Sequence, residues 1–262
     1  MSGWRLLKLE THSAYVNMAV DEAILTARIQ NLAPNTVRFY RWNPSAVSIG
    51  KFQDVQNEVQ LENCRKHGVD VVRRITGGGT VYHDAEHEIT YSVIAAKEDL
   101  KAKDVTAVYT KIYGGLAEAL RLMGLTADFN LGNAKTCPNL TVKGKKISGS
   151  AQSHKKGVVL QHGTLLADVD LERMFTLLRV PWAKTCMEVV HVAEDRITSI
   201  RKELGRSVSQ QEVNQALIGG FEKALNITFE EGDLTGYERD LADKLHSEKY
   251  AADEWNLHGK SS

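Results

Sequence analysis

The sequence predicts a single α/β domain of the α+β type, and three observations support this prediction. Strand-like and helix-like segments are mixed along residues 1–170, without the regular alternation of a doubly wound parallel sheet. From Leu171 onward the apolar patterns have a helical period, so residues 171–262 are expected to form a mainly helical cover over the same core. No repeat or low-complexity linker divides the 262 residues.

The overall composition excludes several classes of protein. Lys and Arg number 33, as do Asp and Glu, so no net charge attracts nucleic acid or anionic lipid. No apolar run approaches the ~20 residues of a membrane span, and the N-terminus lacks the apolar core of a secretory signal. Three widely spaced cysteines form neither a disulfide framework nor a zinc site. We therefore expect a cytoplasmic protein that binds neither nucleic acid nor a membrane.

Strands and helices are both expected along the first half of the chain. Strands are predicted where β-branched and aromatic residues alternate or cluster, at 4–10, 36–42, 46–50, 69–72 and 88–96. Helices are predicted where apolar residues recur at helical spacing, at 17–29, 54–66 and 105–123. Asp54 and Asp104 are placed to cap the last two of these helices, and Gly68 and Gly124 to end them.

The second half begins with strands and then becomes helical. A short strand at 126–131 leads into a hairpin at 139–152, which turns at Lys143-Gly144, and a further strand follows at 158–168. Helices are predicted at 171–178, 197–204, 209–224 and 234–248. Ser209 and Glu212 have the spacing of a capping box, which fixes the start of the third of these helices.

Residues 73–84, RRITGGGTVYHD, carry the strongest functional pattern. Three consecutive glycines leave a bare backbone whose N–H groups can approach an anion closely, most often a phosphate. Arg74 could add a forked guanidinium to the same anion. The alternative is a flexible hairpin tip, which is what most glycine-rich turns are. His83 and Asp84 suggest metal or acid–base chemistry, but two residues do not make a metal site.

The segment GKKISGSAQ, residues 144–152, is the second candidate site. A lysine on a rigid strand can hold two negative groups together while they react. Lys145 and Lys146 are adjacent and face opposite sides of a strand, and the alternation does not decide which one enters a cleft. The small residues that follow allow a substrate chain to lie against the backbone. The alternative is a solvated lysine pair beside a tight turn.

A histidine and a cysteine are further candidates for catalytic residues. His162 and Gly163 lie inside the apolar strand QHGTLL, where a histidine is more often a hydrogen-bonded core residue than a catalyst. Cys137, which precedes Pro138, could be a nucleophile if a lysine or histidine lowered its pKa. Most single cysteines are inert packing residues, and that is the alternative here.

Three segments together, RRITGGGTVYHD (73–84), GKKISGSAQ (144–152) and QHGTLLADVDL (161–171), resemble the lipoate-protein ligase family. This family belongs with the biotin ligases and octanoyltransferases. Supporting segments are NMAVDEAIL (17–25), SIGKFQ (48–53) and DEWN (253–256). The resemblance covers nearly the whole chain. It implies a fold similar to that of biotin ligases and class II aminoacyl-tRNA synthetases, with a mixed sheet flanked by helices.

The resemblance also implies an ATP-dependent reaction. Lipoate attacks the α-phosphate of ATP to give lipoyl-AMP, and a lysine of a lipoyl carrier domain then takes the lipoyl group. The family's catalytic lysine lies directly before an Ile-Ser-Gly-Ser run, so the role falls to Lys146. Mg²⁺ is implied by the triphosphate, with no ligands identified. The residues implied for ATP or lipoyl-AMP are Arg74, Gly77, Gly78, Gly79, Thr80, Val81, Tyr82, His83, Asp84 and Lys146, and those implied for lipoate are Lys146, Gly149, Ser150, His162 and Gly163.

One departure from the ligase pattern concerns the end of the chain. Lipoate ligases of the longer type carry a small C-terminal accessory domain, and this sequence ends at DEWNLHGKSS without one. Some members of the family receive that domain as a separate subunit. The resemblance therefore predicts a small accessory protein as a partner.

A second departure favours a cysteine-dependent octanoyltransferase, which takes the acyl group from a carrier protein without ATP. Residues 83–92, HDAEHEITYS, resemble the ExTYS sequence motif of those enzymes more than the ligase pattern. The segment AQSHKKGVVLQHG (151–163) also resembles those enzymes more than the ligases. Their nucleophile, however, lies about a dozen residues before the Gly-Lys-Lys turn, typically as Cys-Phe. Cys137 is followed by proline and lies seven residues before Gly144.

The glycine stretch also differs from that alternative. Octanoyltransferases tend to have Gly-Gly-Arg where this chain has Gly78-Gly79-Thr80. The two mismatches favour the ligase as the predicted function. A non-catalytic module that binds lipoate or its adenylate is a third possibility, although the presence of both Lys146 and the Arg-Gly stretch is evidence against it.

Overall fold

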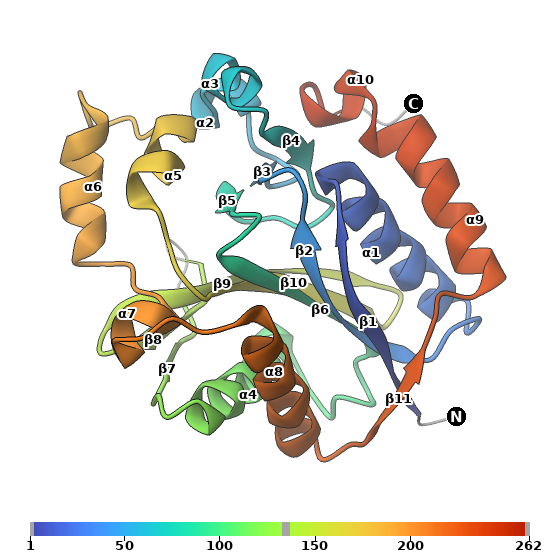
Figure 1. Ribbon diagram of the computed structural model, residues 1–262. Coiled ribbons are helices and arrows are strands. Elements are labelled where there is room, and N and C mark those ends of the chain that lie inside the picture. The colour runs from blue at the N-terminus through green and yellow to red at the C-terminus, as the bar shows by residue number, and fades with distance from the viewer. Residues whose placement is uncertain (1–2, 133–136, 260–262) are drawn as a thin grey trace.

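The computed structural model describes residues 3–132 and 137–259. Its centre is an eight-stranded sheet in the order β11-β1-β2-β6-β10-β9-β8-β7 (Figure 1). These strands are β1 (Trp4–His12), β2 (Asn35–Trp42), β6 (Glu88–Ala96), β7 (Asp128–Asn130), β8 (Asn139–Val142), β9 (Lys145–Lys155), β10 (Val158–Leu166) and β11 (Phe229–Gly232). A second sheet has the order β4-β3-β5 and consists of β3 (Ala46–Ile49), β4 (Asp70–Arg73) and β5 (Val81–His83).

Both sheets contain parallel and antiparallel pairs. In the large sheet β1 runs parallel to β2 and β11, whereas the pairs from β2 through β6, β10, β9 and β8 to β7 are antiparallel. In the small sheet β3 is parallel to β4 and antiparallel to β5. The predicted α/β class, a mixed sheet flanked by helices, is therefore confirmed.

Helices cover both faces of the large sheet (Figure 1). They are α1 (Ala14–Ile29), α2 (Val55–Glu58), α3 (Leu61–Lys66), α4 (Val105–Leu122), α5 (Leu171–Leu177), α6 (Cys186–Glu194), α7 (Ile200–Leu204), α8 (Gln210–Leu225), α9 (Gly236–Leu245), a π-helical turn η1 (His246–Tyr250) and α10 (Asp253–Asn256). The side chains of Asp54 and Asp104 cap α2 and α4, as predicted from the sequence.

Helices α4 and α8 cover one face of the sheet and enclose the largest apolar cluster. Phe221 of α8 packs against Phe39 of β2, with 5.7 Å between the ring centroids. The two helices approach so closely that a Cβ atom on Gly220 would lie 2.5 Å from the carbonyl oxygen of Gly115. Burial of this apolar area is the main source of stability on this side of the sheet.

Helices α1 and α9 cover the opposite face (Figure 1). Val20 and Ile24 of α1 pack against Ile94 and Leu160 of the sheet. The helix also buries a polar side chain, Asp21, which is 1% exposed. A buried carboxylate must be paired or hydrogen-bonded, so the inner face of α1 carries a polar function as well as a packing one.

Several element boundaries differ from those predicted. The single helix predicted at 54–66 is two short helices, because Val59 between them forms a β-bridge with Leu178. Helix α6 was not predicted from the sequence, although Thr185 and Glu188 form a complete capping box at its start. At α8 only half of the predicted box forms, because Glu212 pairs with Arg206 instead of the cap backbone.

Residues 171–262 are mainly helical where described, but they also contribute β11 to the edge of the large sheet. The predicted helix at 234–248 is α9 followed by the π-helical turn η1. No helix among residues 3–132 and 137–259 is long and apolar enough to cross a bilayer.

Arg73 at the end of β4 connects the C-terminal helix α10 to the loop after β3. Its Nε donates to the carbonyl of Trp255 at 2.9 Å, and its Nη1 donates to the carbonyl of Gln53 at 2.6 Å. Trp255 Nε1 returns a bond of 2.7 Å to the carbonyl of Arg73. The DEWN segment noted in the sequence therefore has a structural role beside residues 50–53.

Candidate active site

A cavity of about 190 Å³ lies where the two sheets meet. Its exposed end includes Gly78, Gly79 and Cys137, whereas its inner end is lined by buried side chains, among them Met18 and Trp42. The complete lining is Met18, Tyr40, Trp42, Ser48, Arg74, Gly78, Gly79, Thr80, Val81, His83, Thr90, Cys137, Pro138, Lys146, Gly149, Ser150, Ala151, His162, Gly163 and Thr164. The shape fits a narrow, mostly apolar group with a reactive polar end.

Most of the residues singled out in the sequence meet at this cavity. The three motifs contribute Arg74, residues 78–81, His83, Lys146, Gly149, Ser150, His162 and Gly163, and Cys137 joins them. Gly77, Tyr82 and Asp84 do not line it. Tyr82 packs in a separate apolar cluster and donates its hydroxyl to Asp84. Asp84 in turn accepts bonds from two backbone N–H groups of the following turn.

The lysine that enters the cavity is Lys146, which lies beside a β-bulge. Leu140 of β8 is opposite Ser148 and Thr141 is opposite Lys146, so Ile147 is an extra residue in β9. Lys145 faces elsewhere and donates to the carbonyl of Glu194 at 2.9 Å.

The backbone and side chain of Lys146 are both held in place. Its N–H donates to the carbonyl of Arg196, and its own carbonyl accepts from Thr198 N–H. The side chain crosses Gly149 so closely that a Cβ atom there would lie 2.8 Å from Nζ. A side chain at position 149 would therefore displace the end of the Lys146 side chain.

The ammonium of Lys146 is surrounded by protein yet open to the cavity. Lys146 as a whole residue is exposed, and the surface that it exposes lines the cavity. Burial lowers its pKa, the charge of Arg74 lowers it further, and a thiolate at Cys137 opposes both effects. No described residue accepts a hydrogen bond from its Nζ atom.

Cys137 is exposed and lines the same cavity as Lys146. Of the other two cysteines, Cys64 is buried, and burial raises its pKa to about 11, which disfavours the reactive thiolate. Cys186 is half-buried in a separate cleft between α5 and α6. Of the three cysteines, Cys137 is accordingly the one that lines this cavity.

Arg74 does not point its guanidinium at an open anion site. It is buried, and it donates to Ser48, to Thr76 and to the backbone carbonyls of Gly77 and Gly79. Every nitrogen of the group therefore has an acceptor within the protein. Burial lowers its pKa to about 10, so that it stays charged at neutral pH. Arg74 holds the glycine loop in shape, and binding an external anion would break those bonds.

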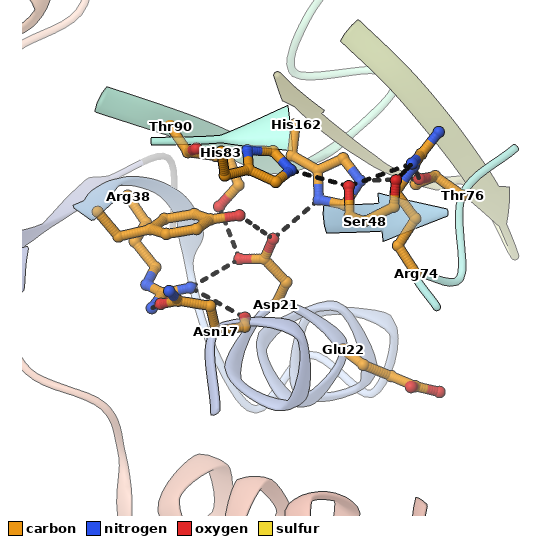
Figure 2. Close-up of polar contacts among 12 residues, drawn as sticks. Asn17, Asp21, Glu22, Arg38, Ser48, Arg74, Thr76, His83, Thr90 and His162 are labelled. Carbon is orange, nitrogen blue, oxygen red and sulfur yellow. Dashed lines mark hydrogen bonds and ion pairs between the residues drawn. The ribbon is translucent and has the colours of Figure 1, made fainter. Parts of the chain in front are cut away.

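A chain of buried polar groups leads from Arg74 to α1 (Figure 2). Arg74 Nε donates to Thr76 Oγ1 at 3.1 Å, and Thr76 Oγ1 lies 2.7 Å from Nε2 of His162. Nδ1 of His162 lies 3.0 Å from Asp21 Oδ2. The pattern is satisfied when the threonine donates to a neutral imidazole whose Nδ1–H donates to the carboxylate.

The charge states in this chain follow from burial and bonding. Burial lowers the pKa of His162 more than Asp21 raises it, so the ring is neutral. For Asp21, burial raises the pKa, but the hydrogen bond from His162 and the charge of Arg38 outweigh this effect and lower it. Arg38 Nη1 lies 3.0 Å from Asp21 Oδ1.

A second chain of the same kind starts at Ser48 (Figure 2). Arg74 Nη1 donates to Ser48 Oγ at 3.2 Å, and this oxygen lies 2.8 Å from Nε2 of His83. Nδ1 of His83 lies 2.7 Å from Glu88 Oε1, and the ring stacks on Trp42 at 4.0 Å. His83 therefore belongs to the buried framework of the cavity. These contacts support neither metal binding by His83 nor acid–base chemistry together with Asp84. No cluster of metal-binding side chains occurs among the described residues.

Sequence reasoning missed the partners of the two histidines. Asp21, Ser48, Thr76 and Glu88 are all nearly inaccessible to solvent, at 0–2%. A signal was present for Asp21, which occurs on the apolar face of the helical segment NMAVDEAIL. A charged residue on an apolar helix stripe must have a buried partner. The partners themselves come from other strands, and only the fold brings them together.

The protonation of His162 gives a pH prediction. The unfolded chain binds a proton near the ordinary histidine pKa of 6.5, whereas the folded chain resists it because the pKa is lowered. Stability should therefore be fully present above about pH 6.5 and decrease as the pH falls below it. In His162→Gln this proton is absent, so the free energy of unfolding from urea titrations should decrease less between about pH 6.5 and 5.

The exposed His67→Gln is the matched control for this measurement. It should lose stability toward acid as the unmodified protein does. Equal slopes for the unmodified protein and His162→Gln would show that His162 does not carry the effect.

Two solved structures that superpose on nearly the whole chain are lipoate ligases. A bi-partite lipoate protein ligase from Thermoplasma acidophilum superposes with a TM-score of 0.85 and 31% identity, covering 100% of this chain and 99% of its own. A lipoate-protein ligase A bound with ATP superposes with a TM-score of 0.86 and 33% identity, covering 99% and 100%. The fold is thus that of lipoate-attaching enzymes.

The family is shown by the sequence. The model of the lipoyl protein ligase A/B catalytic domain matches residues 13–222, and the chain belongs to this family. The resemblance noted in the sequence is therefore confirmed, and the protein is an enzyme of the lipoate ligase and octanoyltransferase family.

Full-length relatives correct the predicted reaction. The chain is 36% identical to octanoyltransferase LipM of Clostridioides difficile, over 98% of this chain and 99% of the relative. It is 38% and 39% identical to the octanoyltransferases LipM of Brevibacillus brevis and Kyrpidia tusciae, with the same coverage. These relatives are named as transferases, so the predicted function of an ATP-dependent lipoate ligase is wrong.

Proposed function

We propose that this protein is a cysteine-dependent octanoyltransferase, which moves an octanoyl group from a carrier protein to a lysine of a lipoyl domain. The observation that supports this function is the meeting of Cys137 and Lys146 at one cavity, in a chain whose full-length relatives are octanoyltransferases. Covalent catalysis divides one difficult transfer into two easier ones. The cysteine serves as the temporary carrier of the acyl group.

In the first step the Cys137 thiolate attacks the carbonyl carbon of the octanoyl thioester on the carrier. The carbonyl electron pair moves to oxygen and gives a tetrahedral intermediate. When the carbon–oxygen double bond re-forms, the bond to the carrier sulfur breaks. The carrier leaves as a thiol after taking up a proton, and the octanoyl group remains on Cys137 as a thioester.

In the second step the amine of the acceptor lysine attacks the same carbonyl carbon. An amide bond forms, the bond to Cys137 Sγ breaks, and the amine loses a proton. No phosphate bond is consumed, because a thioester is already activated toward an amine.

Lys146 is the residue we assign to charge and proton handling. Its ammonium lies at the cavity that Cys137 lines and has no acceptor among the described residues, so it can stabilise the thiolate. Its lowered pKa makes its proton easier to release than that of a free lysine. It can therefore supply the proton taken by the departing carrier sulfur and accept one from the attacking amine.

The octanoyl chain is assigned to the inner part of the cavity. Met18 and Trp42 are nearly inaccessible to solvent, at 3% and 1%, and line this part. Gly163 allows β9 and β10 to approach closely, since a Cβ atom there would lie 2.3 Å from the carbonyl of Gly149. An extended apolar chain would contact these groups along its length.

The test compares the acyl donors. With octanoyl-carrier protein and a lipoyl-domain acceptor, purified protein should octanoylate the acceptor without nucleotide, as measured by mass spectrometry of the intact acceptor. Octanoate or lipoate with MgATP should give no modified acceptor and no pyrophosphate.

Two other outcomes have clear meanings. Modification that requires MgATP and a free acid would overturn the proposal in favour of a ligase. Binding of lipoate or its adenylate with no turnover of any donor would overturn it in favour of a sensor. The accessory subunit expected for a ligase, and the cytoplasmic location, stay predictions.

A further inference from the structure

Three residues form a row across the large sheet beside the cavity. Tyr91 of β6 is opposite Gly163 of β10, and Gly163 is opposite Ser150 of β9. Because the middle residue has no side chain, the Tyr91 hydroxyl reaches across it to Ser150 Oγ, at 2.5 Å. A Cβ atom on Gly163 would lie 2.8 Å from Ser150 Oγ and would crowd this contact. The row therefore links a hydroxyl of the cavity lining to a tyrosine in the core of the sheet.

A chain of hydrogen bonds fixes which of the two hydroxyls donates. Gln152 Nε2 donates to Gln161 Oε1 at 2.6 Å, and Gln161 Nε2 donates to Tyr91 Oη at 3.0 Å. Burial raises the pKa of Tyr91, so its hydroxyl keeps its proton. Within the described chain the other hydrogen-bond partner of Tyr91 Oη is Ser150 Oγ, so the tyrosine donates its proton to the serine oxygen.

The Ser150 hydroxyl keeps a free hydrogen in this arrangement. Among residues 3–132 and 137–259, its oxygen has one hydrogen bond, the one that it accepts from Tyr91. The serine is half-buried and lines the cavity. A hydroxyl has one hydrogen and two lone pairs, so its O–H can still donate to a group bound in the cavity.

Ser150 lies close to the two residues assigned to the reaction. Its neighbour Gly149 lies under the end of the Lys146 side chain, 2.8 Å from Nζ at the position of a Cβ atom. Burial raises the pKa of Tyr113, Ser150 lowers it, and a thiolate at Cys137 raises it further, so both residues lie near the Tyr113 hydroxyl. The serine, the ammonium and the thiol therefore share one part of the cavity.

We propose that the Ser150 hydroxyl donates a hydrogen bond to the acyl carbonyl oxygen as negative charge develops on it, and that Tyr91 is its positioning residue. This inference rests on the proposed acyl transfer. As Cys137 Sγ adds to the thioester carbon, the carbonyl electron pair moves to oxygen, and the serine O–H stabilises the resulting charge. When the carbonyl re-forms, the carrier sulfur leaves and the serine keeps its proton. The same donor acts again when the acceptor amine attacks.

The residues that orient this donor come from the two segments that resemble octanoyltransferases more than ligases. HDAEHEITYS (83–92) contributes Tyr91, and AQSHKKGVVLQHG (151–163) contributes Gln152, Gln161 and Gly163. An oxyanion donor accelerates a reaction most when it is already oriented before charge develops. The sequence signal for a transferase and the bonds that orient the serine therefore fall in the same residues.

The first test compares two serines of the same strand. Ser150→Ala removes the proposed donor, whereas Ser148→Ala removes a buried hydroxyl that forms no hydrogen bond in the described chain and does not line the cavity. In single turnover with octanoyl-carrier protein, Ser150→Ala should form octanoyl-Cys137 about 100-fold more slowly than the unmodified protein. Ser148→Ala should retain the original rate. Alkylation of Cys137 by iodoacetamide passes through no oxyanion, so its rate should be unchanged in both variants.

The second test separates positioning by Tyr91 from a general effect on the fold. Tyr91→Phe keeps the ring but loses the hydrogen bond to Ser150, and acylation should slow about tenfold. If Tyr91 acts through Ser150, adding Tyr91→Phe to Ser150→Ala should cause no further loss. A further tenfold loss in the double variant, or no loss in Tyr91→Phe alone, would overturn the positioning role.

An unchanged acylation rate in Ser150→Ala would overturn the oxyanion donor. So would an equal loss of acylation and alkylation, because the variant would then have affected the thiol itself. Failure of the unmodified protein to form octanoyl-Cys137 would instead refute the proposed function.

Discussion

Replacement of Cys137 by serine is expected to abolish octanoyl transfer, with a loss of about 10⁴-fold or more. The serine hydroxyl is far less acidic than the thiol, and Lys146 alone offers no base strong enough to activate it. The measurement is the initial rate of acceptor octanoylation, with mass spectrometry of the enzyme after exposure to octanoyl-carrier protein. The variant should carry no octanoyl group.

Cys186→Ser is the matched control, since this half-buried cysteine lies in a separate cleft. It should retain the full transfer rate and should still acquire one octanoyl group. Transfer by Cys137→Ser at a rate near that of the unmodified protein would show that no acyl-cysteine is required. Loss in Cys186→Ser together with an active Cys137→Ser would assign the nucleophile to the other site.

Replacement of Lys146 by methionine is the second change with a large expected effect. Methionine has a similar length and can lie across Gly149, so the fold should persist, but the cation and its protons are lost. The turnover number should fall about 10²–10⁴-fold, while the KM for octanoyl-carrier protein changes little. Steady-state kinetics with varied donor concentration measure both quantities.

Lys145→Met is the control here because Lys145 Nζ is bonded to the carbonyl of Glu194, outside the cavity. It should leave the turnover number within about twofold of the original, as expected for an exposed surface contact. A similar loss in both variants would mean that the strand, and not the ammonium of Lys146, is the sensitive feature.

Much of the fold could be predicted because its signals are local. The apolar face of α4 and the N-caps Asp54 and Asp104 can be recognised from residues that are close together in the sequence. The edge strand β11 could not be predicted, because residues 229–232 have little apolar alternation and form a strand only by pairing with β1. The break between α2 and α3 likewise depends on a bridge to Leu178, more than a hundred residues away.

Most of the residues that were singled out in the sequence line one cavity, although Gly77, Tyr82 and Asp84 do not. Three motifs from distant parts of the sequence do meet at one cavity, and Lys146 enters it. The reaction was assigned wrongly because two local mismatches were taken as evidence against a transferase: the distance of Cys137 from Gly144 along the chain, and Gly78-Gly79-Thr80 in place of Gly-Gly-Arg. Nucleophilic catalysis requires proximity in space, and Cys137 and Lys146 have it as lining residues of one cavity.

The segment HDAEHEITYS (83–92), which resembles the octanoyltransferase motif, was the more informative indication of the reaction. Each polar side chain from Glu88 to Ser92 holds part of the cavity framework. Glu88 contacts His83, and Thr90 accepts from Trp42 Nε1. Tyr91 bonds Ser150, and Ser92 donates to Asp21.

The attachment of Arg73 to Trp255 has a consequence for biosynthesis. The loop at residues 50–53 is held through a side chain that also needs a segment 182 positions further along the sequence. While a ribosome is still adding that segment, Nε and Nη2 of Arg73 are without their carbonyl acceptors, at the base of the glycine stretch. Premature termination before residue 255 therefore leaves Arg73 without its bonds to the C-terminal segment, and the loop at residues 50–53 loses that connection.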